Sequence, residues 1–165
     1  MVFWWLNFDD DSLRDKINFA MRALLQRVKS AKVSIGGEKI SEIGKGLLIL
    51  FGVRQGDEEK DSLILAEKIA NLRVMSDEND KMNLSIRDVN GQILVVSQFT
   101  LYGDTTFGRR PSFVKAAKPE LAKNLYELFV QQLKDFGIPV KTGKFGEYMA
   151  VELINDGPVT LMVET

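Results

Sequence analysis

Two short segments combine polar side chains with an unusual backbone in a sequence that is otherwise typical of core strands. Residues 97–102 (SQFTLY) directly follow the apolar run 93–96 (ILVV), and residues 155–160 (NDGPVT) stand near the end of the chain. Hydroxyl and amide groups at a strand end can orient a small substrate. A proline inside a strand pattern marks a turn, an edge or a cis peptide bond, because it has no N–H to donate. We therefore expect the chemistry of the protein at these two segments.

The residue inventory narrows that chemistry. The chain of 165 residues contains no histidine and no cysteine. A Ser-His-Asp triad, an imidazole base, a thiolate nucleophile and Cys-ligated zinc are therefore excluded. A hydrolytic reaction would have to use carboxylates, lysine, hydroxyls, backbone dipoles or the substrate itself. We expect neither a metal nor another cofactor.

Thr100 is the one candidate nucleophile within residues 97–102. A threonine hydroxyl needs a base to take its proton, and without histidine the nearby candidates are carboxylates such as Asp104 or a lysine. The alternative is a structural threonine that satisfies backbone groups at the end of a strand. We favour the structural role, and a Thr100-dependent esterase remains a competing hypothesis.

The elements that must position these segments are mostly strands. Apolar patterns predict strands over residues 22–35, 44–53, 92–101, 146–154 and 159–164. Gly36-Gly37 predicts a hairpin turn after the first of them, and Asn90-Gly91 predicts a type I′ hairpin that leads into the central strand.

Two helices complete the pattern. Asp57 can cap a helix that runs to about Leu72. Pro119 suits the first position of a second helix, whose apolar stripe ends at Gly137. Strands outnumber helices and alternate with them irregularly, which predicts a single-domain α/β fold (α+β mixed) with two main helices packed on a mixed sheet.

The amino terminus stands apart from this domain. Residues 1–8 (MVFWWLNF) are apolar, but they are too short to span a bilayer and no basic segment precedes them. We expect neither a signal peptide nor a membrane anchor, but an N-terminal extension over residues 1–20 and one domain over residues 21–165. The lack of cysteine fits a reducing compartment, so we expect a cytoplasmic protein.

Six segments in order resemble the D-aminoacyl-tRNA deacylases. They are residues 26–28 (QRV), 44–48 (GKGLL), 81–85 (KMNLS), 97–102 (SQFTLY), 108–113 (GRRPSF) and 155–160 (NDGPVT). The likeness covers residues 21–165. Related animal-type deacylases have an alanine where Phe99 stands, so the chain resembles the standard branch. The resemblance implies a largely antiparallel sheet with a barrel-like core.

The resemblance also implies a homodimeric enzyme that hydrolyses the ester between a D-amino acid and the terminal ribose of tRNA. In this family the Gly157-Pro158 bond is cis and enters the pocket of the other subunit, where its carbonyl oxygens occupy the space that an L side chain needs. Selection then depends on rejecting the L-enantiomer. Glycine has no side chain to reject, so the pocket should also accept glycyl-tRNA, including alanine tRNA mischarged with glycine.

The family attributes catalysis to the substrate, because the 2′-hydroxyl of the terminal adenosine helps to activate the attacking water. The share of the protein would be positioning and stabilisation of the oxyanion by backbone N–H groups near Phe99 and Thr100. Ser97 and Gln98 would hold the terminal adenosine or the amino group. With the resemblance we further expect substrate-binding roles for Gly157, Pro158, Asn155, Arg27 and Met149, with Arg27 as a support for Gly157-Pro158. Arg109 and Arg110 are either phosphate contacts on tRNA or solvated charges of a loop.

A hypothesis from another class is a nucleic-acid-binding module without catalysis, since some eukaryotic relatives are described as DNA-binding factors. The balance of charge argues against it. The chain carries 22 Lys and Arg against 23 Asp and Glu, a net charge of −1, and has no basic stripe rich in aromatic residues. Non-specific affinity for DNA comes mainly from neutralised phosphates.

Overall fold

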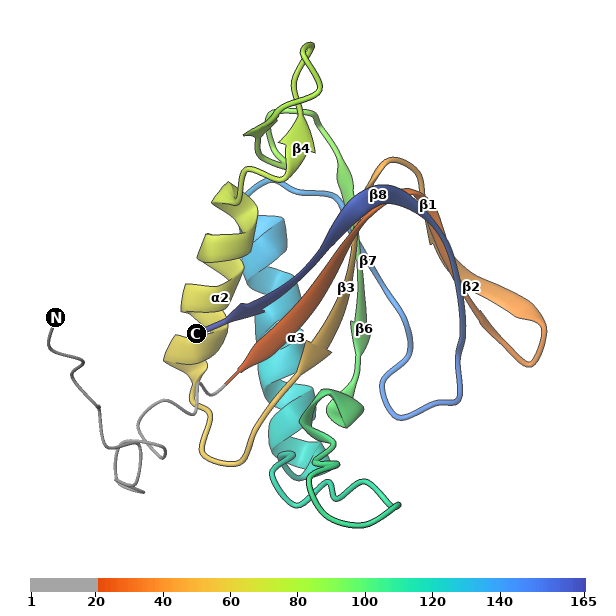
Figure 1. The fold of residues 1–165 in the computed structure, drawn as a ribbon, viewed down its shortest axis with the longest axis vertical. Coiled ribbons are helices and arrows are strands. Elements are labelled where there is room, and N and C mark those ends of the chain that lie inside the picture. Colours follow the sequence, from red (N-terminus) through yellow and green to blue (C-terminus); the bar gives the residue numbers. More distant parts are fainter. Residues whose placement is uncertain (1–20) are drawn as a thin grey trace, which may run out of the picture.

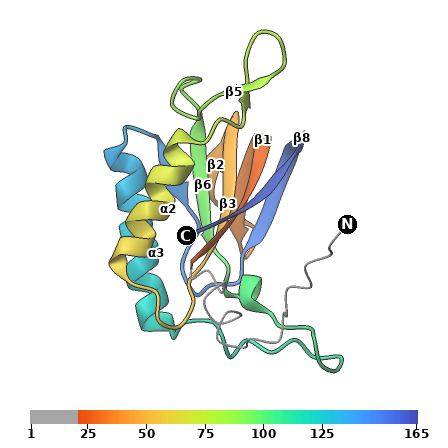
Figure 2. The same ribbon diagram turned by 60° about the vertical axis from the view of Figure 1, so that its left-hand side comes forward.

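The computed structural model describes residues 21–165, so the predicted extension over residues 1–20 lies outside the described part. Two helices lie side by side on one face of a twisted sheet (Figures 1 and 2). The helices are α2 (Glu59–Asn71) and α3 (Pro119–Asp135), and a short 3-10 helix, η1, covers Phe99–Tyr102. The strands are β1 (Arg22–Ile35), β2 (Glu38–Ile43), β3 (Gly46–Gly52), β4 (Met75–Ser76), β5 (Met82–Leu84), β6 (Gln92–Ser97), β7 (Val140–Thr142) and β8 (Ala150–Glu164).

The main sheet has the strand order β2-β1-β3-β6-β7, with β8 paired to β1. β1 is antiparallel to β2, β3 and β8, while the β3–β6 and β6–β7 pairs are parallel. Ser41 of β2 donates a hydrogen bond from its hydroxyl to the carbonyl of Thr142 in β7 (2.8 Å), which joins the two ends of that order. The mixed, largely antiparallel and barrel-like fold with two main helices is therefore confirmed.

Alternation along the central strands builds a core on each face of the sheet. Leu47, Ile49 and Phe51 of β3 face the helices, where Phe51 stacks on Phe129 of α3 at a centroid distance of 4.3 Å. Leu48 turns to the opposite face and packs in a second cluster with residues of β1, β2 and β6. Since side chains alternate between faces along a strand, one buried strand serves both clusters.

Local signals for turns and helix ends are mostly confirmed. Gly36 and Gly37 both have positive φ (57° and 85°) and connect β1 to β2, as a two-residue hairpin of the primed type requires. Pro119 is the first residue of α3, and Gly137, just beyond its end, has a φ of 80°. These conformations depend on short-range backbone sterics, which sequence reasoning captures well.

The predicted cap of α2 is wrong. Glu58 is the N-cap residue, and its backbone N–H donates to the carboxylate of Asp61 at 2.8 Å. Asp57 instead turns back to accept a hydrogen bond from the backbone N–H of Arg54 at 2.7 Å, and it is buried. The Asp57 carboxylate, which the sequence predicts as the cap of the helix, is therefore bound by the preceding turn instead.

The predicted Asn90-Gly91 hairpin is also wrong. Asn90 has a φ of 49°, but Gly91 does not have the positive φ that a type I′ turn requires. Its N–H donates to the carbonyl of Ile86 (3.0 Å), and a Cβ on Gly91 would collide with the Ile86 side chain. β6 then pairs in parallel with β3 rather than with β5. Tight packing under the turn, not hairpin geometry, requires this glycine.

Two predicted strand limits are corrected as well. The central strand ends at Ser97, because Phe99–Tyr102 forms η1 instead of continuing to residue 101. The two predicted terminal strands are one strand, β8, with an irregularity where it passes Arg27. Both corrections fall on the polar segments singled out above.

Candidate active site

The segment of Ser97, Gln98, Phe99 and Thr100 forms the end of β6 and the first turn of η1. The Gln98 N–H donates to the carbonyl of Phe51 on β3 at 2.7 Å, which extends the parallel ladder by one step. The chain then tightens, and the Gly103 N–H donates to the carbonyl of Thr100 at 3.0 Å. Within residues 21–165, no hydrogen bond satisfies the backbone N–H of Phe99 or Thr100. These N–H groups open a helical turn and are free to bind an anion.

Thr100 lacks a base in this arrangement. Its hydroxyl oxygen accepts a hydrogen bond from the side-chain amide of Gln98, and an amide cannot take a proton from it. Asp104, the candidate base in the sequence, binds the N–H of Thr106 (2.9 Å) and Lys115 (3.3 Å) instead. Hydrogen bonds from Thr106 and Lys115 lower the pKa of Asp104 to about 2. A carboxylate with so low a pKa is a poor general base.

The Gly157-Pro158 bond is cis, and it lies where β8 departs from regular pairing with β1. Thr160 pairs with Gln26 and Asn155 pairs with Val28, so residues 156–159 of β8 pass a single residue of β1, Arg27. The excess residues bulge out of the ladder. Gly157 and Pro158 are both exposed at this bulge.

Arg27 fixes the base of the bulge. Its side chain is 9% exposed, and its Nε lies 3.1 Å from both the carbonyl and the carboxylate of Asp156. A second guanidinium nitrogen, Nη1, donates to the carbonyl of Val74 (2.9 Å) and the hydroxyl of Ser76 (3.2 Å). A planar guanidinium with several donors in fixed directions suits such a junction. Arg27 thus contacts Asp156, the residue directly before Gly157-Pro158.

Asn155 braces the bulge from the other side. Its amide donates to the carbonyls of Arg27 (3.0 Å) and Val159 (3.4 Å). A Cβ at position 157 would lie 2.5 Å from the Asn155 side-chain oxygen. Because both hydrogen bonds hold the amide nitrogen of Asn155, a larger residue at position 157 would have to displace a side chain that supports the bulge.

The two polar segments lie far apart within one subunit. The register pairs Arg27 with Leu47 and Leu47 with Ile93, so the bulge is level with Ile93, and Ser97 lies four residues further along β6. At about 3.3 Å per residue this gives roughly 13 Å along the strand, and three strand spacings add roughly 14 Å across the sheet. Figure 1 shows η1 at the opposite end of the sheet from β4, which Arg27 contacts.

Within residues 21–165, no hydrogen bond or ion pair joins Met149, Arg109 or Arg110 to either segment. Met149 packs in the cluster on the face without helices, with its sulfur 3.4 Å from the N–H of Lys144. Arg109 and Arg110 are exposed in the loop that follows η1, and no ion pair to either occurs among residues 21–165. Near the start of this loop Phe99, itself 55% exposed, meets Phe113 edge-on at 5.2 Å.

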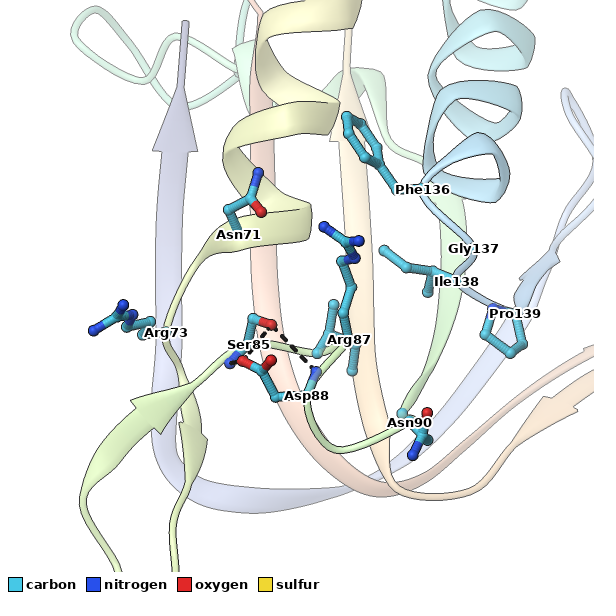
Figure 3. Close-up of a pocket in the computed structure, with 12 residues that line it drawn as sticks. Asn71, Arg73, Ser85, Arg87, Asp88, Asn90, Phe136, Gly137, Ile138 and Pro139 are labelled. Carbon is cyan, nitrogen blue, oxygen red and sulfur yellow. Dashed lines mark hydrogen bonds between the residues drawn. The ribbon is translucent and has the colours of Figure 1, made fainter.

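A cavity of about 630 Å³ lies elsewhere. It is lined by the end of α2, residues 85–91 and the segment after α3. Figure 3 shows Arg87 between Asn71 and Ile138 in this cavity. None of the predicted site residues lines it. This cavity therefore does not mark the predicted site.

Sequence reasoning missed Asp156 as a structural partner. It is the residue that joins Arg27 to the bulge. A carboxylate directly before Gly157-Pro158 and an arginine within an apolar strand were the available signals. Their pairing depends on the β1–β8 register. The two residues are 129 positions apart in the sequence, so no local sequence pattern indicates that they pair.

Comparison with known proteins agrees with this arrangement. The family model described as D-Tyr-tRNA(Tyr) deacylase matches residues 24–164. D-aminoacyl-tRNA deacylases of Thermosipho africanus (strain TCF52B) and Clostridioides difficile (strain 630) are 54% and 56% identical over 145 residues, which is 88% of this chain and 97% of each relative.

Two solved structures share the fold. One, titled c-Myc DNA Unwinding Element Binding Protein, is 42% identical, with a TM-score of 0.82 over 87% of this chain and 98% of the other. A probable eukaryotic D-amino acid tRNA deacylase is 14% identical, with a TM-score of 0.78 over 88% of this chain and 100% of the other. At that identity the second likeness concerns the fold alone.

These matches and the fold define the class of protein, that of the aminoacyl-tRNA deacylases. The chain belongs to the D-Tyr-tRNA(Tyr) deacylase family. The predicted family is thereby confirmed. None of the helices within residues 21–165 is long and apolar enough to cross a membrane.

Proposed function

We propose that this protein is a D-aminoacyl-tRNA deacylase, which hydrolyses the ester between a D-amino acid and the terminal ribose of tRNA. Family membership supports the reaction class. The observation that carries the proposal is the braced bulge, in which a buried arginine, an ion pair and an asparagine amide hold Gly157-Pro158 at the surface. A fixed backbone presented to solvent suits the rejection of one enantiomer, because it cannot rotate away as a side chain can.

The active form would be a homodimer. One site that uses both polar segments needs a second copy, because roughly 13 Å along the strand and 14 Å across the sheet separate them within one chain. β8 pairs only with β1 among the described strands, and it exposes four large apolar side chains, those of Leu153, Ile154, Leu161 and Met162. A second copy that covers this strand would place its own residues 97–100 near Gly157-Pro158.

A charge on β8 tests the dimer. Ile154, 58% exposed, would become buried against the second copy, so Ile154→Asp should give a monomer in sedimentation and lower hydrolysis at least 100-fold. Ile64→Asp is the matched control, since Ile64 is 52% exposed and belongs to α2 rather than to β8. An Ile154→Asp variant that remains dimeric and active would contradict the cross-subunit site.

Rejection of the L-enantiomer would come from the backbone of the bulge. The carbonyl oxygens of residues 157 and 158 would fill the space that an L side chain needs, while the hydrogen of a D-residue would fit there. Glycine presents hydrogens on both sides, so glycyl-tRNA would also be a substrate, including alanine tRNA mischarged with glycine. Glycyl-tRNA would be accepted because the site would reject L side chains instead of binding the D side chain.

Catalysis would combine substrate and backbone groups. The 2′-hydroxyl of the terminal adenosine would help to activate the water, in keeping with a chain that has no histidine or cysteine. The N–H groups of Phe99 and Thr100, which bind no acceptor within residues 21–165, would stabilise the oxyanion. Ser97 and Gln98 would hold the terminal adenosine or the amino group.

The decisive experiment compares matched D-tyrosyl-, L-tyrosyl- and glycyl-tRNA as substrates of the full chain after treatment with a chelator. We expect rapid release from the D and glycyl substrates and none above background from the L substrate. Release from none of the three would overturn the proposed reaction. Equal release of D- and L-tyrosine would leave an esterase without the proposed selection.

A second candidate function is binding of DNA without catalysis. It is favoured by one observation, the 42% identity to the protein titled c-Myc DNA Unwinding Element Binding Protein. Affinity for plain duplex DNA that falls steeply with salt would support it, because counterion release accompanies phosphate contacts. Weak binding that changes little with salt would rule it out.

A further inference from the structure

The loop that follows η1 holds its tip away from the rest of the domain. Asp104 and Ser112 form a two-way backbone bridge, with N–H to carbonyl distances of 2.8 and 2.9 Å. The Asp104 carboxylate also accepts a hydrogen bond from the Thr106 N–H and pairs with Lys115. The base of the loop is therefore fixed, and residues 105–111 extend from it as a short exposed segment.

The tip of this loop carries an unpacked aromatic ring between exposed polar residues. Phe107 is 86% exposed, whereas Phe113 at the base packs on Phe99. Gly108 has a φ of 73°, which turns the chain directly after the ring. Arg109 and Arg110 follow and are both exposed. Because the Phe107 ring contributes little to the packing of the fold, its surface is free to bind a ligand.

A flat ring beside two guanidinium groups is suited to single-stranded nucleic acid. Unpaired bases stack on aromatic side chains, and arginines bind the phosphates that link them. The contact between Phe113 and Phe99 places the base of this loop beside η1, and Figure 1 shows the loop at the same end of the molecule as η1, whose first residues carry the free N–H groups. Nucleotides next to the terminal adenosine would pass along this loop.

We propose that Phe107 stacks on an unpaired base of the tRNA acceptor end while Arg109 and Arg110 bind the adjoining phosphates. This subsite rests on the proposed deacylase function and extends it beyond the reacting adenosine. The near-neutral chain, with a net charge of −1, has no general attraction for RNA. A local site of this kind would thus decide how the single-stranded 3′ end of tRNA enters the active site.

Kinetics with D-tyrosyl-tRNA test the stacking. Phe107→Leu keeps an apolar side chain but removes the aromatic face, and we expect KM to rise roughly tenfold while kcat stays within about twofold. Phe107→Tyr should restore the KM. Val114→Ala is the matched control, because Val114 is 77% exposed near the same loop but lies beyond its base. An unchanged KM in Phe107→Leu would overturn the proposal.

Binding of deacylated tRNA gives an independent measurement. A fluorescent adenine analogue is placed at single positions of the unpaired 3′ end, and stacking on Phe107 should quench it at one of them. Quenching should be lost in Phe107→Leu, and the variant should bind a blunt acceptor duplex as the wild type does. Loss of affinity for the blunt duplex, or quenching that survives the substitution, would contradict the inference.

The two proposals fail in different ways. If the wild type does not hydrolyse D-tyrosyl-tRNA, the proposed reaction is wrong, and the fluorescence titration still decides whether Phe107 stacks on RNA. If the wild type hydrolyses it normally and Phe107→Leu has the same KM, only the stacking site is wrong.

Discussion

The two polar segments of this domain differ in how they are held. Asn155, Asp156 and Arg27 fix the Gly157-Pro158 bulge through an ion pair and side-chain hydrogen bonds to backbone carbonyls. The Ser97–Thr100 segment is held mainly by backbone bonds, and Phe99 and Thr100 expose their side chains. The first arrangement fixes a shape, and the second leaves donors free. The proposed selection and the proposed catalysis would thus place different demands on the backbone.

Among the substitutions that test this difference between the segments, replacement of Arg27 should have the largest effect. Arg27→Met leaves the Asp156 carboxylate and the Val74 carbonyl without their partner. Loss of one partner of a buried pair costs about 3–5 kcal/mol. Because the Asp156 side chain is 32% exposed, we expect about 2–3 kcal/mol in urea unfolding. Discrimination between D- and L-tyrosyl-tRNA should fall as the bulge loosens.

Lys32→Met is the matched control for Arg27. Lys32 also lies on β1 and pairs with a residue of β8, Glu152, at 2.9 Å, but both side chains are more exposed. An exposed pair contributes at most about 1 kcal/mol, so stability and discrimination should change little. Equal effects of the two substitutions would show that the bulge needs no buried support.

Gly157→Ala tests the shape of the bulge without removing a partner. The added Cβ would lie 2.5 Å from the side-chain oxygen of Asn155, so either this side chain, which supports the bulge, or the backbone must shift. A displacement on the order of 1 Å lowers turnover about 100-fold, and we expect that loss in kcat/KM for D-tyrosyl-tRNA. Gly44→Ala is the control, since its Cβ would meet only Gln92 at 3.7 Å. Full activity of Gly157→Ala would show that the bulge tolerates displacement.

Thr100→Ala examines the other segment. The free N–H groups belong to the backbone, so the substitution should leave them in place and reduce kcat less than about tenfold. A covalent mechanism through Thr100 would instead lose nearly all turnover. Single-turnover hydrolysis of D-tyrosyl-tRNA distinguishes the two outcomes and decides the Thr100-dependent esterase hypothesis.

Sequence reasoning succeeded where short-range sterics decide the structure. The Gly36-Gly37 turn and the start of α3 at Pro119 depend on their own residues. It failed at Asn90-Gly91, where packing on Ile86 and the parallel pairing of β6 override a strong hairpin signal. Burial of Asp57 likewise reassigned the cap of α2 to Glu58. Each failure reflects a tertiary contact that overrides local preference.

The candidate site shows the same division. The motifs at residues 97–100 and Gly157-Pro158 can be found in the sequence because their chemistry is local. The pairing of Arg27 with Asp156 depends on strand register across 129 positions. The distance between the motifs also comes only from the sheet topology, and it is this distance on which the proposed homodimer rests.

The last and smallest effect concerns Asp57, which lies near η1. Burial raises the pKa of Asp57 to about 6 from the ordinary value of 3.8, and one of its oxygens has no hydrogen-bond partner among the described residues. An acid with a raised pKa in the folded state binds more protons there than in the unfolded state. Stability should therefore fall as the pH rises from about 4 to 6. Burial raises the pKa of Tyr102, and the charged form of Asp57 raises it further, so Asp57 acts on the end of η1.

Asp57→Asn should remove this dependence. The amide carbonyl can still accept the hydrogen bond from the Arg54 N–H, while the buried charge is gone. We expect the variant to be about 1 kcal/mol more stable than the wild type in urea unfolding at pH 7, with a difference that shrinks towards pH 4. A variant less stable at both values would mean that the carboxylate is needed as an ion. In that case the Ser97–Thr100 end of the sheet would depend on a fixed charge, as the bulge does. The two segments would then differ less in how they are held than their hydrogen bonds indicate.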